Sequence, residues 1–96
     1  MLECHKEDGR LRLQGELRMA FLETLKQELA SADTGRELEI DLSQVSEVDL
    51  AGLQLLLSYL RSRPSQAPAR LKGCTADFRK ALELTGLEPH FSAYLA

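Results

Sequence analysis

The sequence predicts an α/β fold: a mixed β-sheet of about four strands with helices packed on it, in the order β-β-α-β-α-β-α. Segments with an apolar residue at every second position alternate with segments whose apolar residues recur at i, i+3, i+4 and i+7. Strands separated by helices favour right-handed crossovers and parallel pairing. The length of 96 residues is typical of one domain, so we expect residues 1–96 to form a single unit.

Composition excludes several classes of protein. The chain is 44% hydrophobic and 28% charged, which is typical of a soluble globular domain. Its 12 basic and 15 acidic residues give a net charge of −3 with no basic cluster, so nucleic acid is not an expected partner. No stretch approaches the roughly 18 apolar residues of a transmembrane helix, and MLECHKEDGR lacks the features of a leader. We therefore expect a cytoplasmic protein.

The first third of the chain predicts a hairpin and a helix. Two alternating segments, LECHKED and LRLQG, flank Gly9 and Arg10 and indicate a pair of antiparallel strands. A helix is expected from about Met19 to Ala30, ending near the segment SADTG. Its apolar positions are Phe21, Leu22, Leu25 and Leu29.

The middle third predicts a central strand, a loop and a second helix. ELEIDLS alternates with a period of two, as expected of a strand, and DLSQVSEVD is expected to contain the loop that follows. Asp49 can cap the helix, which should run to about Ser62 before Pro64 and Pro68 interrupt the pattern. The buried stripe of this helix is expected to be Leu53, Leu56, Leu57 and Leu60.

The last third predicts one strand and one helix. ARLKG is the strand candidate. The helix should begin near Thr75 and end at Gly86, where Leu87 can fold back onto it. The expected buried residues are Phe78, Ala81 and Leu82. The terminal EPHFSAYLA is too short to assign and is expected to add a turn or an edge strand.

Three separated segments together resemble the STAS domain, the family of bacterial anti-sigma-factor antagonists that also appears in sulfate transporters. LEIDLSQVSEVDLAGLQLLL is similar to the family's central strand, loop and second helix. GCTADFRKALELTGLEPHF is similar to its last helix, and LRLQGEL is similar to its second strand with a small glycine turn. The resemblance covers most of the chain and implies a single STAS domain.

The resemblance assigns roles to individual residues. Asp41 falls on the acid that ends the central strand, Asp49 on the acid before the phosphorylated hydroxyl, and Ala51 and Gly52 on the small pair after it. Leu50 falls on the hydroxyl itself. In the family, a kinase-fold anti-sigma factor phosphorylates that Ser or Thr and the phosphate abolishes binding. Leucine has no oxygen to receive a phosphate, so the usual switch is absent.

The resemblance thus implies a non-enzymatic regulatory module that binds an anti-sigma factor, a kinase-fold protein or another signalling protein through the helix starting at Asp49. A residue in the first helical turn lies beside the exposed N-terminus, and a glycine there lets another backbone approach closely. A leucine at this place offers an apolar contact of about 1.5–3 kcal/mol if a partner buries it. The predicted partner-binding residues are Asp41, Ser43, Ser46, Asp49, Leu50, Ala51, Gly52, Gln54 and Leu55.

Two leucines of this set have alternative explanations. Leu50 lies about 70° from the centre of the predicted stripe, so it belongs either to the core or to the surface. Leu55 lies on the opposite side from the stripe and is either a scattered surface leucine or part of the binding face. Ser43 and Ser46 are ordinary turn residues or alternative phosphate acceptors.

Catalysis has little support, and we predict no enzyme, metal or cofactor. Asp41 and Asp49 could form a carboxylate pair, but each has an ordinary structural role. No nucleophile motif or phosphate-binding glycine loop is present. The two histidines are far apart, and the two cysteines lack CxxC spacing and are expected to be free thiols. These four residues are His5, His90, Cys4 and Cys74.

The sequence is also compatible with two other protein complexes, one with an ABC ATPase and one between two copies of this chain. IDLSQVSEVDLAGLQLLL also resembles the small STAS subunit of bacterial phospholipid-trafficking ABC transporters, which implies an ABC ATPase as the partner. That family too has a Thr where this chain has Leu50. Homodimerisation through an apolar helix face is the other assembly.

Overall fold

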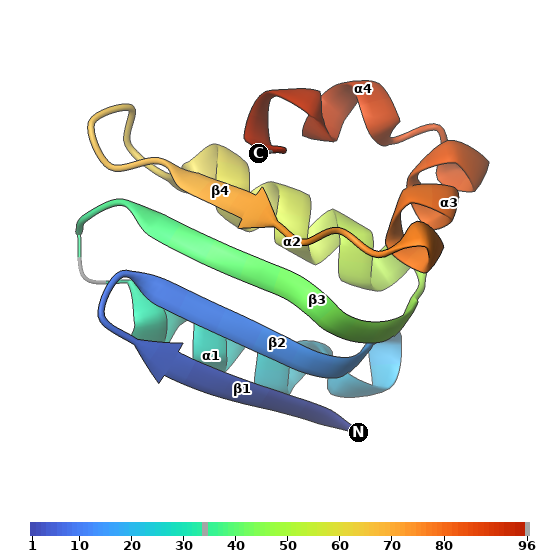
Figure 1. Cartoon of the computed structure of the whole chain (residues 1–96), viewed down its shortest axis with the longest axis horizontal. Helices are drawn as coiled ribbons and strands as arrows, with labels where there is room; N and C mark the ends of the chain where they lie inside the picture. Colours follow the sequence, from blue (N-terminus) through green and yellow to red (C-terminus); the bar gives the residue numbers. More distant parts are fainter. Residues whose placement is uncertain (34, 96) are drawn as a thin grey trace.

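The computed structural model describes residues 1–33 and 35–95. Thr34, in the segment SADTG, and Ala96, in the terminal segment, belong to the predicted single domain but lie outside the described residues. The sheet has the strand order β1-β2-β3-β4 (Figure 1). β1 (Leu2–Glu7) and β2 (Arg10–Leu17) form the predicted antiparallel hairpin. β3 (Leu38–Val48) pairs in parallel with β2 and with β4 (Ala69–Lys72), so the prediction of a central strand is confirmed.

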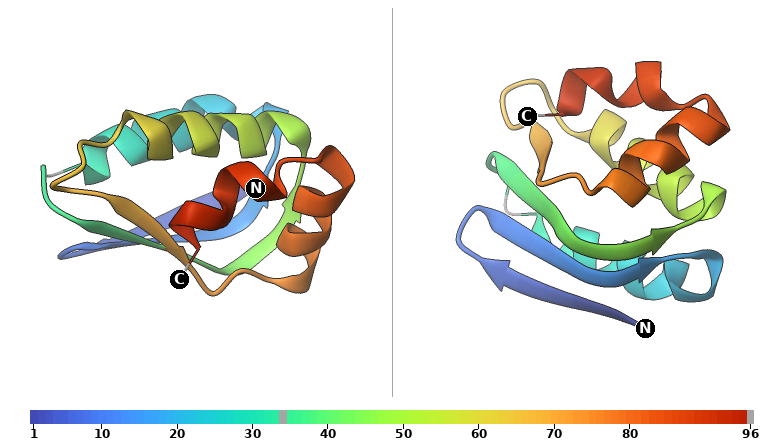
Figure 2. Two further views of the ribbon diagram at one scale, coloured as in Figure 1. Left: turned by 90° about the horizontal axis from the view of Figure 1, so that it is seen from above. Right: turned by 45° about the vertical axis from the view of Figure 1, so that its right-hand side comes forward.

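Helices cover one face of the sheet. Figure 2 shows α1 (Leu22–Ala32) and α2 (Leu50–Ser62) side by side above the strands. The short helix η1 (Met19–Phe21) leads into α1. α3 (Ala76–Thr85) packs against β3 and is followed by α4 (Glu88–Phe91) and η2 (Ser92–Tyr94).

The core lies between the sheet and the helices. β2, the first part of β3 and β4 alternate between apolar side chains facing the helices and mainly charged side chains facing solvent. Phe78 of α3 and Phe91 of α4 meet edge to face, with ring centroids 6.0 Å apart, and both are fully buried. The fully buried strand residues are Leu11, Leu13, Leu17, Ile40, Leu42 and Leu71.

The helix boundaries follow the sequence pattern closely. α2 ends at Ser62 as predicted, and Thr75 caps α3 by accepting a hydrogen bond from the Phe78 N–H at 3.1 Å. Gly86 is left-handed, with φ of 73°, and the Leu87 N–H donates to the Leu82 carbonyl at 3.1 Å. The terminal segment forms the helical turns α4 and η2, and Leu95 makes one isolated bridge to Leu71 of β4, but no edge strand forms among the described residues.

The predicted loop in DLSQVSEVD is wrong, because β3 continues to Val48. Its pairing with β2 shifts register twice, and each time β3 contributes one extra residue. These bulges keep the strand paired and place Ser43 and Ser46 within it. Asp41 therefore lies in the middle of the strand rather than at its end. Gly15 likewise lies within β2, with φ of 107°, rather than in a turn.

Candidate functional site

The start of α2 is organised by the carboxylate of Asp49. Oδ1 accepts a hydrogen bond from the Gly52 N–H at 2.9 Å, which makes Asp49 the predicted N-cap. Oδ2 accepts from the Met19 N–H, also at 2.9 Å, and so fixes η1 beside α2. Two apolar side chains are held at the surface by this arrangement: Leu50 is 47% exposed and Met19 is 70% exposed.

Gly52 serves the fold rather than the surface. It is buried, and a Cβ atom at this position would lie 2.1 Å from the carbonyl oxygen of Leu17. The same carbonyl accepts a hydrogen bond from the Asp49 N–H at 3.1 Å. The backbone that approaches this glycine closely is therefore the chain's own β2, which corrects the expectation that the glycine admits a partner.

Leu50 and Leu55, for which the sequence left two alternatives each, have different surroundings in the structure. Leu50 belongs to the surface, not to the core. Leu55 is half-buried in a groove of about 300 Å³ between α1 and α2, where Leu29 and Tyr59 also lie. It is thus not a scattered surface leucine. Gln54 is exposed on α2.

A further exposed leucine at this end of the molecule was missed by the sequence analysis. Leu84 of α3 is 77% exposed and shares a cavity of about 480 Å³ with Ser46 and Val48 at the end of β3. Figure 1 shows η1, the start of α2 and α3 at the same end of the sheet. The sequence does contain a sign of this exposure, because Leu84 is not among the predicted buried residues of the last helix. We call this surface the Asp49 corner: Met19, Ser46, Asp49, Leu50 and Leu84.

Ion pairs flank the Asp49 corner. Arg18, just before η1, lies 2.8 Å from Glu16 and 3.5 Å from Glu47, bridging the ends of β2 and β3. Arg18 and Glu47 are exposed, so each pair adds little to stability. They give the apolar corner a polar rim.

Asp41 and Ser43 form a separate cluster. Asp41 Oδ1 accepts from the Ser43 N–H at 2.9 Å, close to Gly73 after β4. Burial alone would raise the pKa of Asp41, but the Ser43 hydrogen bonds and the charges of Arg12 and Arg10 hold it below its usual value. The carboxylate is therefore ionised and bonded within its own strand.

The predicted set of site residues thus divides into two places. Asp41 and Ser43 lie together on β3, whereas Asp49 caps α2 and the residues from Leu50 onward lie on it. Ser46, also on β3, belongs to the Asp49 corner, and its hydroxyl donates to the Gly15 carbonyl at 3.1 Å. The two aspartates have different backbone partners, which does not favour a shared acid–base or metal site.

The other titratable groups offer no catalytic arrangement. Within residues 1–33 and 35–95, no group of three His, Cys, Asp or Glu side chains is placed to hold a metal ion. Cys4 and Cys74 are free and half-buried, and burial raises the pKa of Cys4 to about 11. This thiol is therefore protonated at neutral pH. His5 and His90 are exposed.

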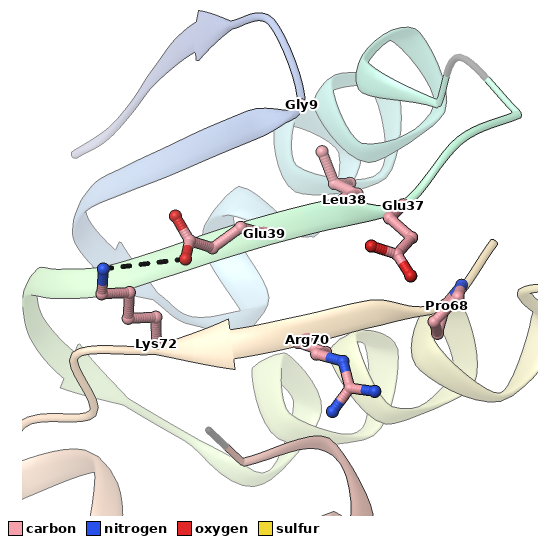
Figure 3. A pocket seen from close by; sticks show the side chains of 7 residues that line it. All are labelled: Gly9, Glu37, Leu38, Glu39, Pro68, Arg70 and Lys72. Carbon is pink, nitrogen blue, oxygen red and sulfur yellow. Dashed lines mark ion pairs between the residues drawn. The ribbon is translucent and has the colours of Figure 1, made fainter.

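A cavity of about 270 Å³ lies at the β1–β2 turn and the starts of β3 and β4 (Figure 3). Acidic and basic side chains line it together, and Lys72 Nζ lies 3.7 Å from Glu39. The lining has two acidic and two basic side chains, so its charges favour neither a cation nor an anion. The lining residues are Gly9, Glu37, Leu38, Glu39, Pro68, Arg70 and Lys72.

Comparison with known proteins agrees with this architecture. The family model described as "Mlab, STAS domain" matches residues 1–92. The crystal structure of an anti-sigma factor antagonist from Mycobacterium paratuberculosis superposes with a TM-score of 0.77 at 23% identity, over 99% of this chain and 83% of that chain. The anti-sigma factor antagonist SpoIIAA in its unphosphorylated form gives 0.70 at 19% identity, over 100% and 86%. The phosphorylated form of the Bacillus cell fate determinant SpoIIAA gives 0.64 at 17% identity, over 100% and 89%.

No curated protein sequence matches the chain. Among the described residues, no helix has the length and apolar character needed to cross a membrane. The family-model match spans both the sheet and the Asp49 corner, and the solved structures share the complete fold. The chain belongs to the STAS domain family.

Proposed function

We propose that this chain is a non-enzymatic, cytoplasmic regulatory module that binds a protein partner through the Asp49 corner, in the manner of an anti-sigma-factor antagonist. The observation that supports this most is Leu50, which is 47% exposed on the first turn of a helix whose leucine stripe is buried. A single exposed leucine is common on protein surfaces, but Leu50 lies at the same helix start as the exposed Met19, so the two offer a shared apolar surface. A partner that covers it gains the free energy of burial.

The partner surface is expected to combine apolar and polar contacts. Leu50 and Met19 supply the apolar part, and the exposed Gln54 and half-buried Ala51 extend it along α2. The charges of Arg18 and its acidic partners lie at the rim, where they favour orientation more than affinity.

Leu50 also makes the module a constitutive binder. A phosphorylated residue at this position would add about −2 charge to the helix N-terminus beside Asp49. A hydrocarbon side chain cannot accept the phosphate, so binding is regulated by the amount of protein or partner, or at another residue such as Ser43 or Ser46.

An affinity pull-down with Leu50→Asp as the paired variant tests this function. The matched control is Ser58→Asp, which places the same charge on another exposed position of α2. We expect a kinase-fold or other signalling protein to be recovered with the wild type and the control and to be lost with Leu50→Asp, whose melting temperature should be unchanged. Equal recovery with Leu50→Asp would contradict the proposal. Recovery of an ABC ATPase would instead indicate a transporter accessory subunit.

A further inference from the structure

The outer edge of β1 is unpaired in the part of the chain that the structure describes. β1 is the first strand of the sheet, and Figure 1 shows no element beyond it, whereas β4 at the other edge is bridged by Leu95 through Leu71. The six residues of β1 pair with β2 in unbroken register and include no proline. Free edges are usually protected by bulges, prolines or charged side chains; β1 has no bulge and no proline, and its protection is limited to its charged side chains.

The backbone of β1 presents a defined set of free groups. The Met1 carbonyl accepts a hydrogen bond from the Glu16 N–H at 3.1 Å, so this residue directs its backbone toward β2. In an antiparallel ladder, alternate residues direct their N–H and C=O groups to the same side. Leu2, Cys4 and Lys6 therefore direct theirs outward, away from the sheet.

The side chains of β1 alternate between two faces. Lys6 faces α1, where its Nζ lies 3.1 Å from Glu28, so the charge that would protect the edge is already paired. Glu3 and His5 face the open side of the sheet, 4.0 Å apart. Cys4 faces the core and is half-buried.

We propose that β1 pairs antiparallel with β1 of a second copy of this chain, with Cys4 opposite Cys4 at the two-fold axis. Residues directly opposite in such a pair point to the same face, so a symmetric pair is centred on one residue. Centring on Cys4 places Glu3 opposite His5 of the other copy on both sides of the axis. Centring on His5 places Glu3 opposite Glu7, and centring on Glu3 or Lys6 places like charges together.

The dimer extends the sheet and uses no residue of the Asp49 corner, so it is independent of the proposed function. A contact limited to two short strand edges is smaller than the roughly 1,200–2,000 Å² buried in stable complexes. We therefore expect a concentration-dependent equilibrium between monomer and dimer. Sedimentation of the wild-type protein over a concentration series measures it.

Disulfide trapping tests the register. Two variants, Glu3→Cys and His5→Cys, are made in a background with Cys4→Ser and Cys74→Ser. Opposite residues at this site form a non-hydrogen-bonded pair with Cα atoms about 4.5 Å apart, within the range of a disulfide. A mixed dimer also keeps one complementary Glu3–His5 pair. Under mild oxidation we expect the mixture to cross-link about tenfold faster than either variant alone, because pairing raises the effective thiol concentration.

Three results would overturn the proposal. His5→Cys cross-linking as fast alone as in the mixture would place the axis at His5. A wild-type protein that stays monomeric at every concentration would mean that β1 does not pair with a second copy, and that its free backbone groups bind water or a strand of another protein. The third concerns Lys6→Pro, which removes an outward N–H and also the exposed Lys6–Glu28 ion pair, and which should abolish association while the chain stays folded. Unchanged association of this variant would place the contact elsewhere, including the apolar helix face.

Discussion

The two ends of α2 invert the usual distribution of side chains. At the N-terminal end, Leu50 is 47% exposed, and at the C-terminal end the side chain of Arg63 is only 2% exposed. Charged side chains are almost never fully buried unless they are paired, whereas leucine is among the residues most often fully buried. One end of α2 is therefore enclosed by contacts that stabilise the fold, and the other end leaves apolar side chains at the surface.

Arg63 closes its end by joining segments that are distant in sequence. Nε donates to the Ala67 carbonyl at 3.0 Å, and Nη2 donates to the Arg36 carbonyl. Nη1 pairs with the Asp33 carboxylate and donates to the Tyr59 hydroxyl at 3.4 Å. The guanidinium also lies over the Tyr59 ring, 5.8 Å from its centroid. The end of α1 and the segments before β3 and β4 are thereby held against α2.

The open end has no such enclosure. Both carboxylate oxygens of Asp49 accept from backbone N–H groups, one of α2 and one of η1, so this side chain is occupied within the chain. What is left at the surface is hydrocarbon, on Leu50 and Met19. The closed end should therefore respond to mutation in stability, and the open end in binding.

The largest effect on stability is expected for Arg63→Met. Two backbone carbonyls lose their donor and Asp33 loses its cation, which should lower the free energy of unfolding by about 2–4 kcal/mol. Urea denaturation measures the change. The control is Arg36→Met, which keeps the accepting carbonyl and removes only an exposed side chain. A loss below about 0.5 kcal/mol, typical of surface substitutions, would show that this end is not held by the arginine.

A smaller loss of stability is expected for Gly52→Ala, which adds a buried methyl group at the start of α2, the open end of the helix. The added Cβ would lie 2.1 Å from a backbone oxygen of Leu17, and no side-chain rotation can relieve that contact. We expect a loss of about 1–3 kcal/mol in thermal unfolding, since overpacking forces backbone shifts. Gln54→Ala, at an exposed position of the same helix, should be nearly neutral. Full stability of Gly52→Ala would mean that β2 and α2 are less closely apposed.

The smallest effect concerns the pH dependence of the closed end. The hydrogen bond from Arg63, together with the Gly35 N–H, holds the pKa of Asp33 below its ordinary value of 3.8. A lowered pKa contributes stability that is present above pH 3.8 and is lost as the pH falls through the folded value. Asp33→Asn should therefore flatten the acid side of the stability curve. An unchanged slope, measured by urea denaturation at several acid pH values, would contradict this.

The sequence predicts the fold better than it predicts the site. Period-two and helical patterns are local, so the strands, the Asp49 cap and the end of α3 at Gly86 follow from them. The β3 bulges depend on pairing with β2, which no local pattern in DLSQVSEVD reveals.

Tertiary contacts decide the remaining differences. The burial of Gly52 comes from β2, and the half-buried state of Leu55 comes from α1. Met19 and Leu84 reach the corner from separate elements, so their spacing along the chain gives no sign of it. The sequence does not decide whether Leu50 is exposed, because a helical wheel describes one helix and not the elements that pack beside it.

Amide hydrogen exchange of the chain with and without its captured partner tests the role of the two ends most directly. If the Asp49 corner is the binding surface, exchange should slow at residues 17–20 and 49–54 when the partner is added. Residues 63–68, around the enclosed arginine, should exchange at the same rate in both states. Slowed exchange at residues 63–68 with no change at the start of α2 would contradict the proposed binding surface.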